Sequence, residues 1–576
     1  MPDTNETKLL IRLPRSYTQT LRQTPTLQTQ ILAGLGAGAV EPLFTHASAR
    51  LSASLTDWLV FQPDQVEDRH PWDRAHRQAA SIARGAAALD VYVEPNSAHR
   101  RNFVRTAPDA PTLDAAPTTA PPFPPSAPLN SAYPPAADTA FSPGWHLSRA
   151  GFPRAWAVTR GGGVRIAHLD IGWWPGQYSA PRCMRPDLGY NFVEDNQDTV
   201  DPDDGPNAGH GTATLALLAG NKVSLDGKTE ATPHGQVYEG FIGGAPEAEI
   251  VPVRIAGVLG SVVYLYGNTM ARGLDYALDP GDGRRCDVIS LSQGGLPLKS
   301  WAYAVNALYE AGVVVVAAAG DSYWAVVTDI ATHYTVYPAA FYRVVTATGV
   351  TYDDGPYKRD QLGVMQGCWG PDAVMAKAVG AYTPNVPWMR IETQYGWGLD
   401  GGGTSASTPQ IAAACALWLA RYGSRFPDDW RRVAACRAAL GRSVADARKN
   451  FGEIGLGRLD ACAMMSEALA AEIKTLCDEN KLQHIDPDEV SFPFLRLLFG
   501  LPPPGKGIEG QGVEEMYEVE ALQIFYRSTD PDLVKAVEDY DRGRPPAAGD
   551  LPGLRARFLQ AVDMSDALRG YLTAHA

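Results

Sequence analysis

The sequence predicts an α/β fold in which a mainly parallel β-sheet is covered by helices on both faces. Between residues 145 and 468, short apolar runs alternate with longer segments of helical periodicity. The runs are apolar on both sides, which is typical of strands buried on both faces of a parallel sheet. A helical segment follows most runs, in the order of βαβ units.

The expected elements of this region follow one another along the chain. The strands are "VRIAHLD" (164–170), "EIVPVRI" (249–255), "DVISLS" (287–292) and "GVVVVAAAG" (312–320). The helices are "TATLALLAG" (212–220), "TMARGLDYAL" (269–278) and "WAYAVNALYEAG" (301–312). In a sheet of this kind, functional groups gather at the carboxyl ends of strands and at the starts of helices.

Different segments are expected on either side of this region. Residues 1–105 predict a small α+β domain, with strands at "KLLIRL", "VEPLF" and "DVYVEP" and a helix at "DRAHRQAASIARGAAAL". Its "GLGAGAV" segment (34–40) predicts a turn rather than a nucleotide-binding loop, because the βαβ context is missing. Residues 106–144 predict a stiff, extended linker, because eleven prolines fall between Pro108 and Pro143. Residues 469–576 predict a helical extension.

The composition indicates a folded protein and argues against two classes of function. Apolar residues make up 45% and charged residues 20% of the 576 residues, as in ordinary globular proteins. The net charge of −14 disfavours nucleic acid as the main partner. No run of 18 apolar residues predicts a membrane span, and the first residues lack the apolar core of a secretory signal. Seven scattered cysteines without a CxxC pair favour reduced thiols, so we expect a cytoplasmic protein.

Three polar side chains stand where this architecture predicts a functional site. Asp170 ends a strand, His210 enters the helix of "NAGHGTATLALLAG", and Ser405 enters the helix of "GGGTSASTPQIAAACALWL". A carboxylate, an imidazole and a hydroxyl are the parts of a nucleophilic triad. The glycines before Ser405 allow close approach of a substrate, and the helix start supplies N–H donors for an oxyanion. We therefore expect Asp170, His210 and Ser405 to be catalytic.

The order Asp, His, Ser and the surrounding sequences resemble the subtilisin-like serine peptidases, also called subtilases or peptidase family S8. The three blocks are "AHLDIG", "HGTATLALLAG" and "GTSASTP", and the GxSxG motif of lipases and esterases is absent. Further segments that resemble the family are "GGAPEAEIVPVRI", "DVISLSQGG", "VVVVAAAGD" and "FGEIGLGRLDACAMM". The resemblance covers residues 145–468 and implies a subtilisin-like fold and a serine endopeptidase.

The resemblance also implies where a substrate binds. Ser292, Gln293 and Gly294 would pair with the extended backbone of a peptide, as an added strand does. Residues 257–261 would hold the other side of that peptide. The pocket for the residue before the scissile bond would be walled by Ala318, Ala319 and Gly320.

Residues 1–105 resemble a subtilase pro-region, with "DVYVEPN" similar to its closing strand. Such regions assist folding and inhibit the active site, so the resemblance implies that this domain is an inhibitory partner of its own chain. Whether the domain is removed stays open. Candidate cleavage sites are the region around Arg100 and Arg101 and the proline-rich linker.

The sequence departs from the subtilase pattern at three places. Asp321 stands where the family has an asparagine that donates to the oxyanion. An ionised Asp321 would repel that charge, whereas a protonated one could donate, and an oxyanion donor is worth about 2.7–4 kcal/mol in subtilisin itself. We therefore expect slow catalysis at neutral pH or a preference for mild acid. Ile171 replaces the serine or threonine that follows the catalytic aspartate, and "AKAVG" (376–380) replaces an Ala-Pro-Gly loop.

The expected chemistry requires no cofactor. The acidic run at 194–207 lacks the spacing of an EF-hand, because Gly205 stands where an oxygen ligand belongs. We favour a solvated loop there over a structural calcium site. No HExxH motif or Cys/His cluster indicates zinc. His168 shares a strand face with Asp170 and is interpreted as a packed structural histidine.

The sequence thus predicts a serine endopeptidase that acts on peptides or proteins through an acyl-enzyme. The alternative is a catalytically silent subtilase fold that binds peptides or partners, which Asp321 motivates. A third possibility is a protease that stays latent until a partner displaces residues 1–105.

Overall fold

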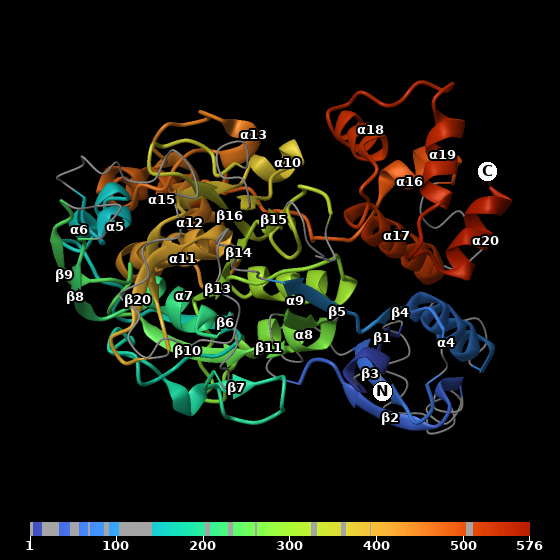
Figure 1. Cartoon of the computed structure of the whole chain (residues 1–576), viewed down its shortest axis with the longest axis horizontal. Coiled ribbons are helices and arrows are strands. Elements are labelled where there is room, and N and C mark those ends of the chain that lie inside the picture. Colours follow the sequence, from blue (N-terminus) through green and yellow to red (C-terminus); the bar gives the residue numbers. More distant parts are fainter. Residues whose placement is uncertain are drawn as a thin grey trace.

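The computed structural model describes most of the chain. The described residues are 4–13, 34–45, 57–66, 69–85, 91–102, 141–201, 208–228, 234–259, 262–323, 331–358, 365–391, 393–502 and 511–575. The predicted linker at 106–144 lies outside them except for its last four residues. Figure 1 shows a large central unit flanked at one end by two smaller units, one from each end of the chain.

The central unit is built on one seven-stranded parallel sheet. Its strand order is β18-β16-β14-β13-β6-β10-β7, and every neighbouring pair is parallel. The strands are β6 (Arg165–Asp170), β7 (Tyr190–Asn191), β10 (Glu249–Arg254), β13 (Val288–Leu291), β14 (Val314–Ala318), β16 (Val345–Val350) and β18 (Val379–Tyr382). The predicted α/β fold with a mainly parallel sheet is confirmed.

Helices bury both faces of this sheet. Val314 and Val316 of β14 pack into one hydrophobic cluster, whereas Val315 and Ala317 pack into the other, because successive strand residues point to opposite faces. One cluster includes α8 (Gly267–Tyr276) and α9 (Lys299–Glu310). The other includes α7 (His210–Ala219), α11 (Gly403–Tyr422), α12 (Trp430–Arg442), α14 (Ala461–Met464) and α15 (Glu467–Asp478).

Smaller elements surround the sheet. The short helices are α5 (Trp145–Arg149), α6 (Phe152–Ala155), α10 (Asp372–Met375) and α13 (Phe451–Ile454). The antiparallel pairs are β8 (Lys222–Asp226) with β9 (Val237–Phe241), β15 (Asp321–Tyr323) with β17 (Met365–Gly367), and β19 (Val386–Met389) with β20 (Trp397–Gly401). A hairpin of β11 (Ala256–Leu259) and β12 (Val262–Tyr266) precedes α8.

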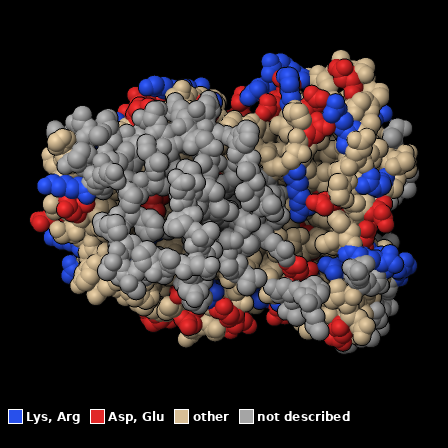
Figure 2. Space-filling model, viewed as in Figure 1, with Lys and Arg blue, Asp and Glu red and all other residues tan. Residues whose placement is uncertain are grey.

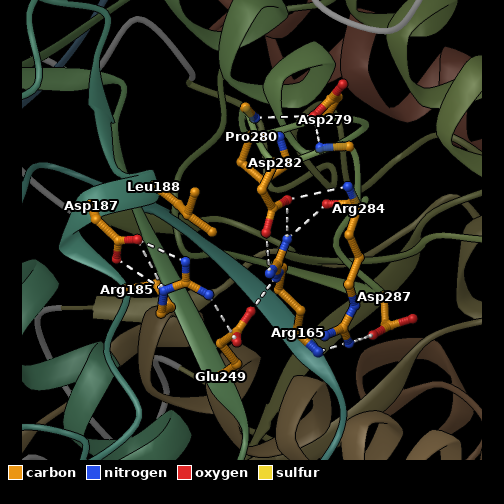
Figure 3. Close-up of polar contacts among 12 residues, drawn as sticks. Arg165, Arg185, Asp187, Leu188, Glu249, Asp279, Pro280, Asp282, Arg284 and Asp287 are labelled. Atoms are coloured by element: carbon orange, nitrogen blue, oxygen red, sulfur yellow. Dashed lines mark hydrogen bonds and ion pairs between the residues drawn. The ribbon is translucent and has the colours of Figure 1, made fainter.

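An ion-pair network fixes the amino end of β6 and so helps to set where its carboxyl end lies. Arg165 donates to both carboxylate oxygens of Asp282, at 2.7 and 2.8 Å, and also pairs with Glu249 of β10 (Figure 3). Its backbone N–H donates to Asp287. The hydrogen bonds from Arg165 lower the pKa of Asp282 to about 2. The Arg165 side chain is 2% exposed. A buried charge is stable only when it is paired and hydrogen-bonded, so Arg165 needs these partners.

The N-terminal unit is a four-stranded antiparallel sheet packed against α4, so it has the predicted α+β character but contains a strand at 58–63 that the sequence analysis did not predict. The sheet order is β2-β3-β1-β4. Its elements are β1 (Leu9–Arg12), β2 (Gly38–Pro42), β3 (Trp58–Pro63), α4 (Pro71–Gly85) and β4 (Tyr92–Pro95). In the predicted turn at 34–40, Gly36 has a φ of +84°, and β2 begins at Gly38.

The C-terminal unit is helical and contacts both other units. Its helices are α16 (Pro493–Phe499), α17 (Gln511–Tyr526), α18 (Pro531–Asp541), α19 (Leu551–Leu559) and α20 (Asp566–Ala574). Glu515 of α17 forms ion pairs with Arg12 of the N-terminal unit at 2.9 Å and with Lys299 of α9 at 2.5 Å. The Trp72 indole of α4 donates to Gln523 at 3.0 Å. Glu515 therefore links all three units.

The surface mixes charges of both signs. On the face drawn in Figure 2, basic and acidic side chains are interspersed in the parts of the surface that are described. None of the described helices is long and apolar enough to cross a membrane.

Candidate active site

Asp170 ends β6 with its carboxylate buried and surrounded by donors. It is 1% exposed, and its Oδ1 accepts hydrogen bonds from the Ile171 N–H at 2.8 Å and from His210 Nδ1 at 2.7 Å. Burial alone would raise the pKa of Asp170. The attraction and hydrogen bond of His210 outweigh burial and lower this pKa to about 2. Asp170 is therefore a carboxylate at neutral pH.

His210 is the first residue of α7, so the helix start carries its imidazole to the end of β6. This close approach requires glycine at position 211, because a Cβ there would lie 1.9 Å from the carbonyl oxygen of Gly172. The imidazole also packs edge-on against the Trp388 indole, with ring centroids 5.6 Å apart. The hydrogen bond to Asp170 assigns the proton of the neutral ring to Nδ1 and leaves Nε2 as the basic nitrogen.

Ser405 lies in the first turn of α11 and is 3% exposed. Its hydroxyl donates to the carbonyl of Ser292 at 3.3 Å, and the Ser292 hydroxyl donates back to the carbonyl of Ser405 at 3.0 Å. Gly403 has a φ of +73°, and a Cβ there would lie 2.7 Å from the Asp321 carboxylate. The glycines before Ser405 thus serve the tight entry into this helix.

Gln293 connects the two halves of this arrangement. Its side-chain amide donates to Asp170 Oδ1 at 3.3 Å, while the residue before it, Ser292, is bonded to Ser405. One dipeptide therefore touches both Ser405 and Asp170, and Asp170 is bonded to His210. Asp170 and His210 are therefore in direct contact at the carboxyl edge of the sheet, and Ser405 is joined to them through Ser292 and Gln293.

The residues predicted to bind substrate lie at the same edge. Ala318 ends β14, and Ala319 and Gly320 follow it directly. The backbone of Gly320 is tied to α11, because its N–H donates to the Thr404 hydroxyl at 3.1 Å and its carbonyl accepts from that hydroxyl. Gly294 lies against the backbone of residue 337, where a Cβ would be 2.6 Å from the carbonyl oxygen.

Asp321, which the resemblance assigns to the oxyanion position, lies beside the start of α11. Its Oδ1 accepts a hydrogen bond from the Thr404 N–H at 2.9 Å, one residue before Ser405. This contact places the carboxylate at the N-terminus of a helix, where N–H groups lack partners within the helix.

Two features of the site were missed or understated by sequence reasoning. The Thr214 hydroxyl donates to Asp170 Oδ2 at 3.1 Å, and His168, which was interpreted as packed, lies 2.9 Å from that hydroxyl through its Nε2. The available signal is spacing, since Thr214 is four residues after His210 on one helix face. In the apolar segment "TATLALLAG", however, a threonine looks like a core residue.

Within the described ranges, no group of three or more His, Cys, Asp or Glu side chains is placed to hold a metal ion. The acidic run at 194–207 is described up to Asp201, whose carboxylate accepts from the Gly209 N–H at 2.8 Å. Its remaining residues, like Ser261 of the predicted substrate segment, lie outside the described residues.

Comparison with known proteins identifies the family. The model of the subtilase family matches residues 161–453, which is 293 of the 576 residues. This chain belongs to the subtilase family. The match contains Asp170, His210 and Ser405 and all seven strands of the parallel sheet, so the predicted subtilisin-like fold is confirmed.

Individual subtilases match at modest identity. Thermitase of Thermoactinomyces vulgaris is 34% identical over 171 residues, 30% of this chain and 52% of thermitase, so the chain spans about half of that relative. Subtilisin Savinase of Lederbergia lenta is 27% identical over 281 residues, 47% of this chain and 82% of its own length. An intracellular serine protease of Paenibacillus polymyxa is 25% identical over 274 residues, 46% of this chain and 69% of that protein. Membership of this family supports a serine peptidase in general terms.

Proposed function

We propose that this subtilase is a serine endopeptidase whose nucleophile is Ser405, whose base is His210 and whose orienting carboxylate is Asp170. The observation that carries this proposal is the 2.7 Å hydrogen bond from His210 to a buried Asp170, next to the dipeptide that holds Ser405. These are the parts that nucleophilic catalysis needs: His210 contacts Asp170 directly, and Ser405 is joined to Asp170 through Ser292 and Gln293.

In the proposed reaction, the Ser405 hydroxyl turns from the Ser292 carbonyl to His210 Nε2 and attacks the scissile carbonyl. His210 takes the hydroxyl proton and passes it to the leaving amine, and Asp170 stabilises the imidazolium in between. The N–H of Ser405 faces the oxyanion at the positive end of α11. Water then releases the acyl group, so the chemistry requires no cofactor.

The N-terminal unit is proposed to inhibit this site by occupying the substrate edge. Its last strand, β5 (Ala98–Asn102), pairs antiparallel with β12 over five residues. The Leu296 N–H donates to His99 Nδ1 at 3.2 Å, so this strand also reaches a point two residues after Gly294, the last of the three residues at 292–294 that we expect to bind substrate. A peptide that adds a strand to β12 would compete directly with β5.

Two further contacts hold the N-terminal unit against the starts of helices. The Glu94 carboxylate accepts from the N–H groups of Lys299 and Ser300 at the start of α9, at 2.8 and 3.1 Å. The Asn96 side chain accepts from the Asn268 N–H at the start of α8, at 2.7 Å. Both contacts use N–H groups that have no partner within their own helix.

A peptide-hydrolysis assay on the full chain tests both parts of the proposal. We expect hydrolysis of an internally quenched peptide by the wild type, and no hydrolysis by Ser405→Ala. We expect Glu94→Gln to raise the rate several-fold, because a charge at the start of α9 is lost and the inhibitory contact weakens by about 1 kcal/mol. Asp64→Asn, on an exposed turn of the same unit, is the matched control and is expected to equal the wild type.

The outcomes separate activity from inhibition. Equal rates for Glu94→Gln and the wild type would contradict inhibition by this contact. Hydrolysis that survives Ser405→Ala would contradict the triad.

The second candidate is a catalytically silent subtilase that binds peptides or partners. Asp321 favours it, because an ionised carboxylate that accepts from the Thr404 N–H, one residue before Ser405, would oppose charge on an oxyanion. Peptide binding to the full chain without hydrolysis, in the wild type and in Glu94→Gln alike, would support this candidate.

A further inference from the structure

The second carboxylate oxygen of Asp170 has its own partners, and the proposed mechanism does not use them. While Oδ1 accepts from His210, Oδ2 accepts from the Thr214 hydroxyl at 3.1 Å. That hydroxyl lies 2.9 Å from His168 Nε2. Thr214 is fully buried and His168 is 3% exposed, so water does not substitute for these contacts.

The chain places these four side chains by simple periodicity. His168 and Asp170 are two residues apart on β6 and share one face of the sheet. His210 and Thr214 are four residues apart on α7 and share one face of that helix. The two faces meet, so each helix residue reaches the carboxylate from a different side.

The direction of the hydrogen bonds follows from counting protons. The Thr214 hydroxyl has one proton, which can go to Asp170 Oδ2 at 3.1 Å or to the carbonyl of Gly211 at 3.2 Å. A hydrogen bond to a carboxylate is the stronger of the two. The hydroxyl oxygen then accepts from His168, which carries its proton on Nε2. The relay runs from His168 through Thr214 to Asp170.

His168 takes part in this relay as a neutral side chain. Burial lowers the pKa of His168 to about 4, in spite of the nearby Asp170 charge. The titratable groups that face the Asp170 carboxylate are His168 from its own strand and His210 from α7, while β13 contributes the neutral Gln293 from its end.

We propose that Thr214 and His168 are positioning residues that hold Asp170 in the orientation His210 needs. They supply a side-chain hydrogen bond that Ile171, with its apolar side chain, does not offer. The proposal rests on the proposed triad and assigns this chain its own way of fixing the orienting carboxylate. Neither residue touches the substrate or gives up a proton in the reaction.

Removing the Thr214 hydroxyl has two expected consequences. The carboxylate loses its hydrogen bond on Oδ2 and is held less firmly by the donors to Oδ1, so fewer molecules hold the imidazole ready to accept the Ser405 proton, and kcat falls. Without the Thr214 donor, the negative charge of the carboxylate also attracts the His210 imidazolium more strongly, so the imidazolium becomes more stable. The acid limb of the pH–rate profile therefore moves to higher pH.

The test compares Thr214→Val, which keeps the shape and removes the hydroxyl, with Thr214→Ser, which keeps the hydroxyl. For Thr214→Val we expect kcat to fall about tenfold with KM nearly unchanged, and the acid limb to rise by about 0.5 pH unit. For Thr214→Ser we expect both values to return close to those of the wild type. An unshifted limb in Thr214→Val, or equal shifts in both variants, would overturn the proposal.

A second pair tests His168 and covers the case in which Thr214→Val does not fold. His168→Gln keeps an N–H donor toward Thr214 and is expected to keep the wild-type limb. His168→Leu removes that donor and is expected to move the limb in the same direction as Thr214→Val, but less. If the acid limb of the pH–rate profile lies at the same pH in these two variants, the proposal would also be overturned.

A spectroscopic measurement separates this proposal from the proposed function. In full-length Ser405→Ala with 15N-labelled histidine, the titration of the His210 ring is followed by NMR with and without Thr214→Val. A rise in its midpoint with Thr214→Val supports the relay even if the wild type hydrolyses no peptide. An unchanged midpoint contradicts the relay even if the wild type is an active peptidase.

Discussion

The carboxyl ends of β6 and β14 each lead to an aspartate, and the two carboxylates have different surroundings. Asp170 is 1% exposed and accepts from three side chains, those of His210 and Thr214 on α7 and that of Gln293 after β13. Asp321 is partly exposed and accepts from the backbone N–H of Thr404 at a helix start. In the proposed reaction, the first orients the base, and the second lies near the developing negative charge. Environment therefore gives one residue type two opposite effects on the same reaction.

The largest expected effect comes from Asp170. Asp170→Asn keeps the shape but removes the charge that stabilises the imidazolium and the acceptor that fixes its tautomer. We expect kcat/KM for a quenched peptide to fall by about 10⁴-fold, as the corresponding change does in other triad enzymes. A loss of less than about tenfold would show that Asp170 does not support the base.

The same substitution at Asp321 is expected to act in the opposite direction. Asp321→Asn replaces a carboxylate with an amide that can donate to the oxyanion. We expect kcat at pH 7 to rise by about 10–100-fold, which is below the full worth of such a donor in subtilisin. The preference of the wild type for mild acid should also become weaker. Superimposable pH–rate profiles of wild type and variant would refute this role.

A smaller effect is expected on the free energy of unfolding in acid, and it depends on Asp170. The folded pKa of Asp170, about 2, lies below that of an unfolded aspartate, about 3.8. Its stabilising contribution is therefore present above pH 4 and is lost as the pH falls from 4 to 2. We expect a loss of about 2 kcal/mol from this group in urea unfolding of the full chain. Asp170→Asn should lack this part of the pH dependence, and an equal loss in the variant would contradict the assignment.

His168 extends this acid sensitivity to higher pH. Its folded pKa of about 4 lies below its ordinary value of 6.5, so the folded state keeps it neutral where the unfolded state takes up a proton. Stability is expected to fall as the pH drops from 6.5 to 4. In His168→Leu, the free energy of unfolding should depend less on pH between pH 6.5 and pH 4.

Much of the fold and the centre of the site could be predicted from the sequence because their signals are local. The strands at "VRIAHLD", "EIVPVRI", "DVISLS" and "GVVVVAAAG" are apolar runs of the right length, and each is a strand of the sheet. Asp170, His210 and Ser405 stand in distinctive blocks at the ends of such elements. The glycines around them can be explained from the sequence, because a residue without a Cβ allows tight turns and close packing of the backbone.

The remaining features depend on contacts between distant segments, which one sequence does not reveal. Thr214 looks like a core residue until the face of α7 is placed against β6. The side chain of Gln293 reaches Asp170, 123 positions away. Arg12 and Glu515 are 503 positions apart, and nothing near either residue predicts their ion pair. These contacts are decided by packing rather than by local pattern.

Labelling with a serine-directed fluorophosphonate tests the central claim most directly. We expect the full-length wild type, over a range of pH or after limited proteolysis, to be labelled on Ser405, with faster labelling in Glu94→Gln. We expect no labelling of Ser405→Ala and strongly slowed labelling of His210→Ala. Undiminished labelling of Ser405→Ala, or no labelling of the wild type under any of these conditions, would contradict the account.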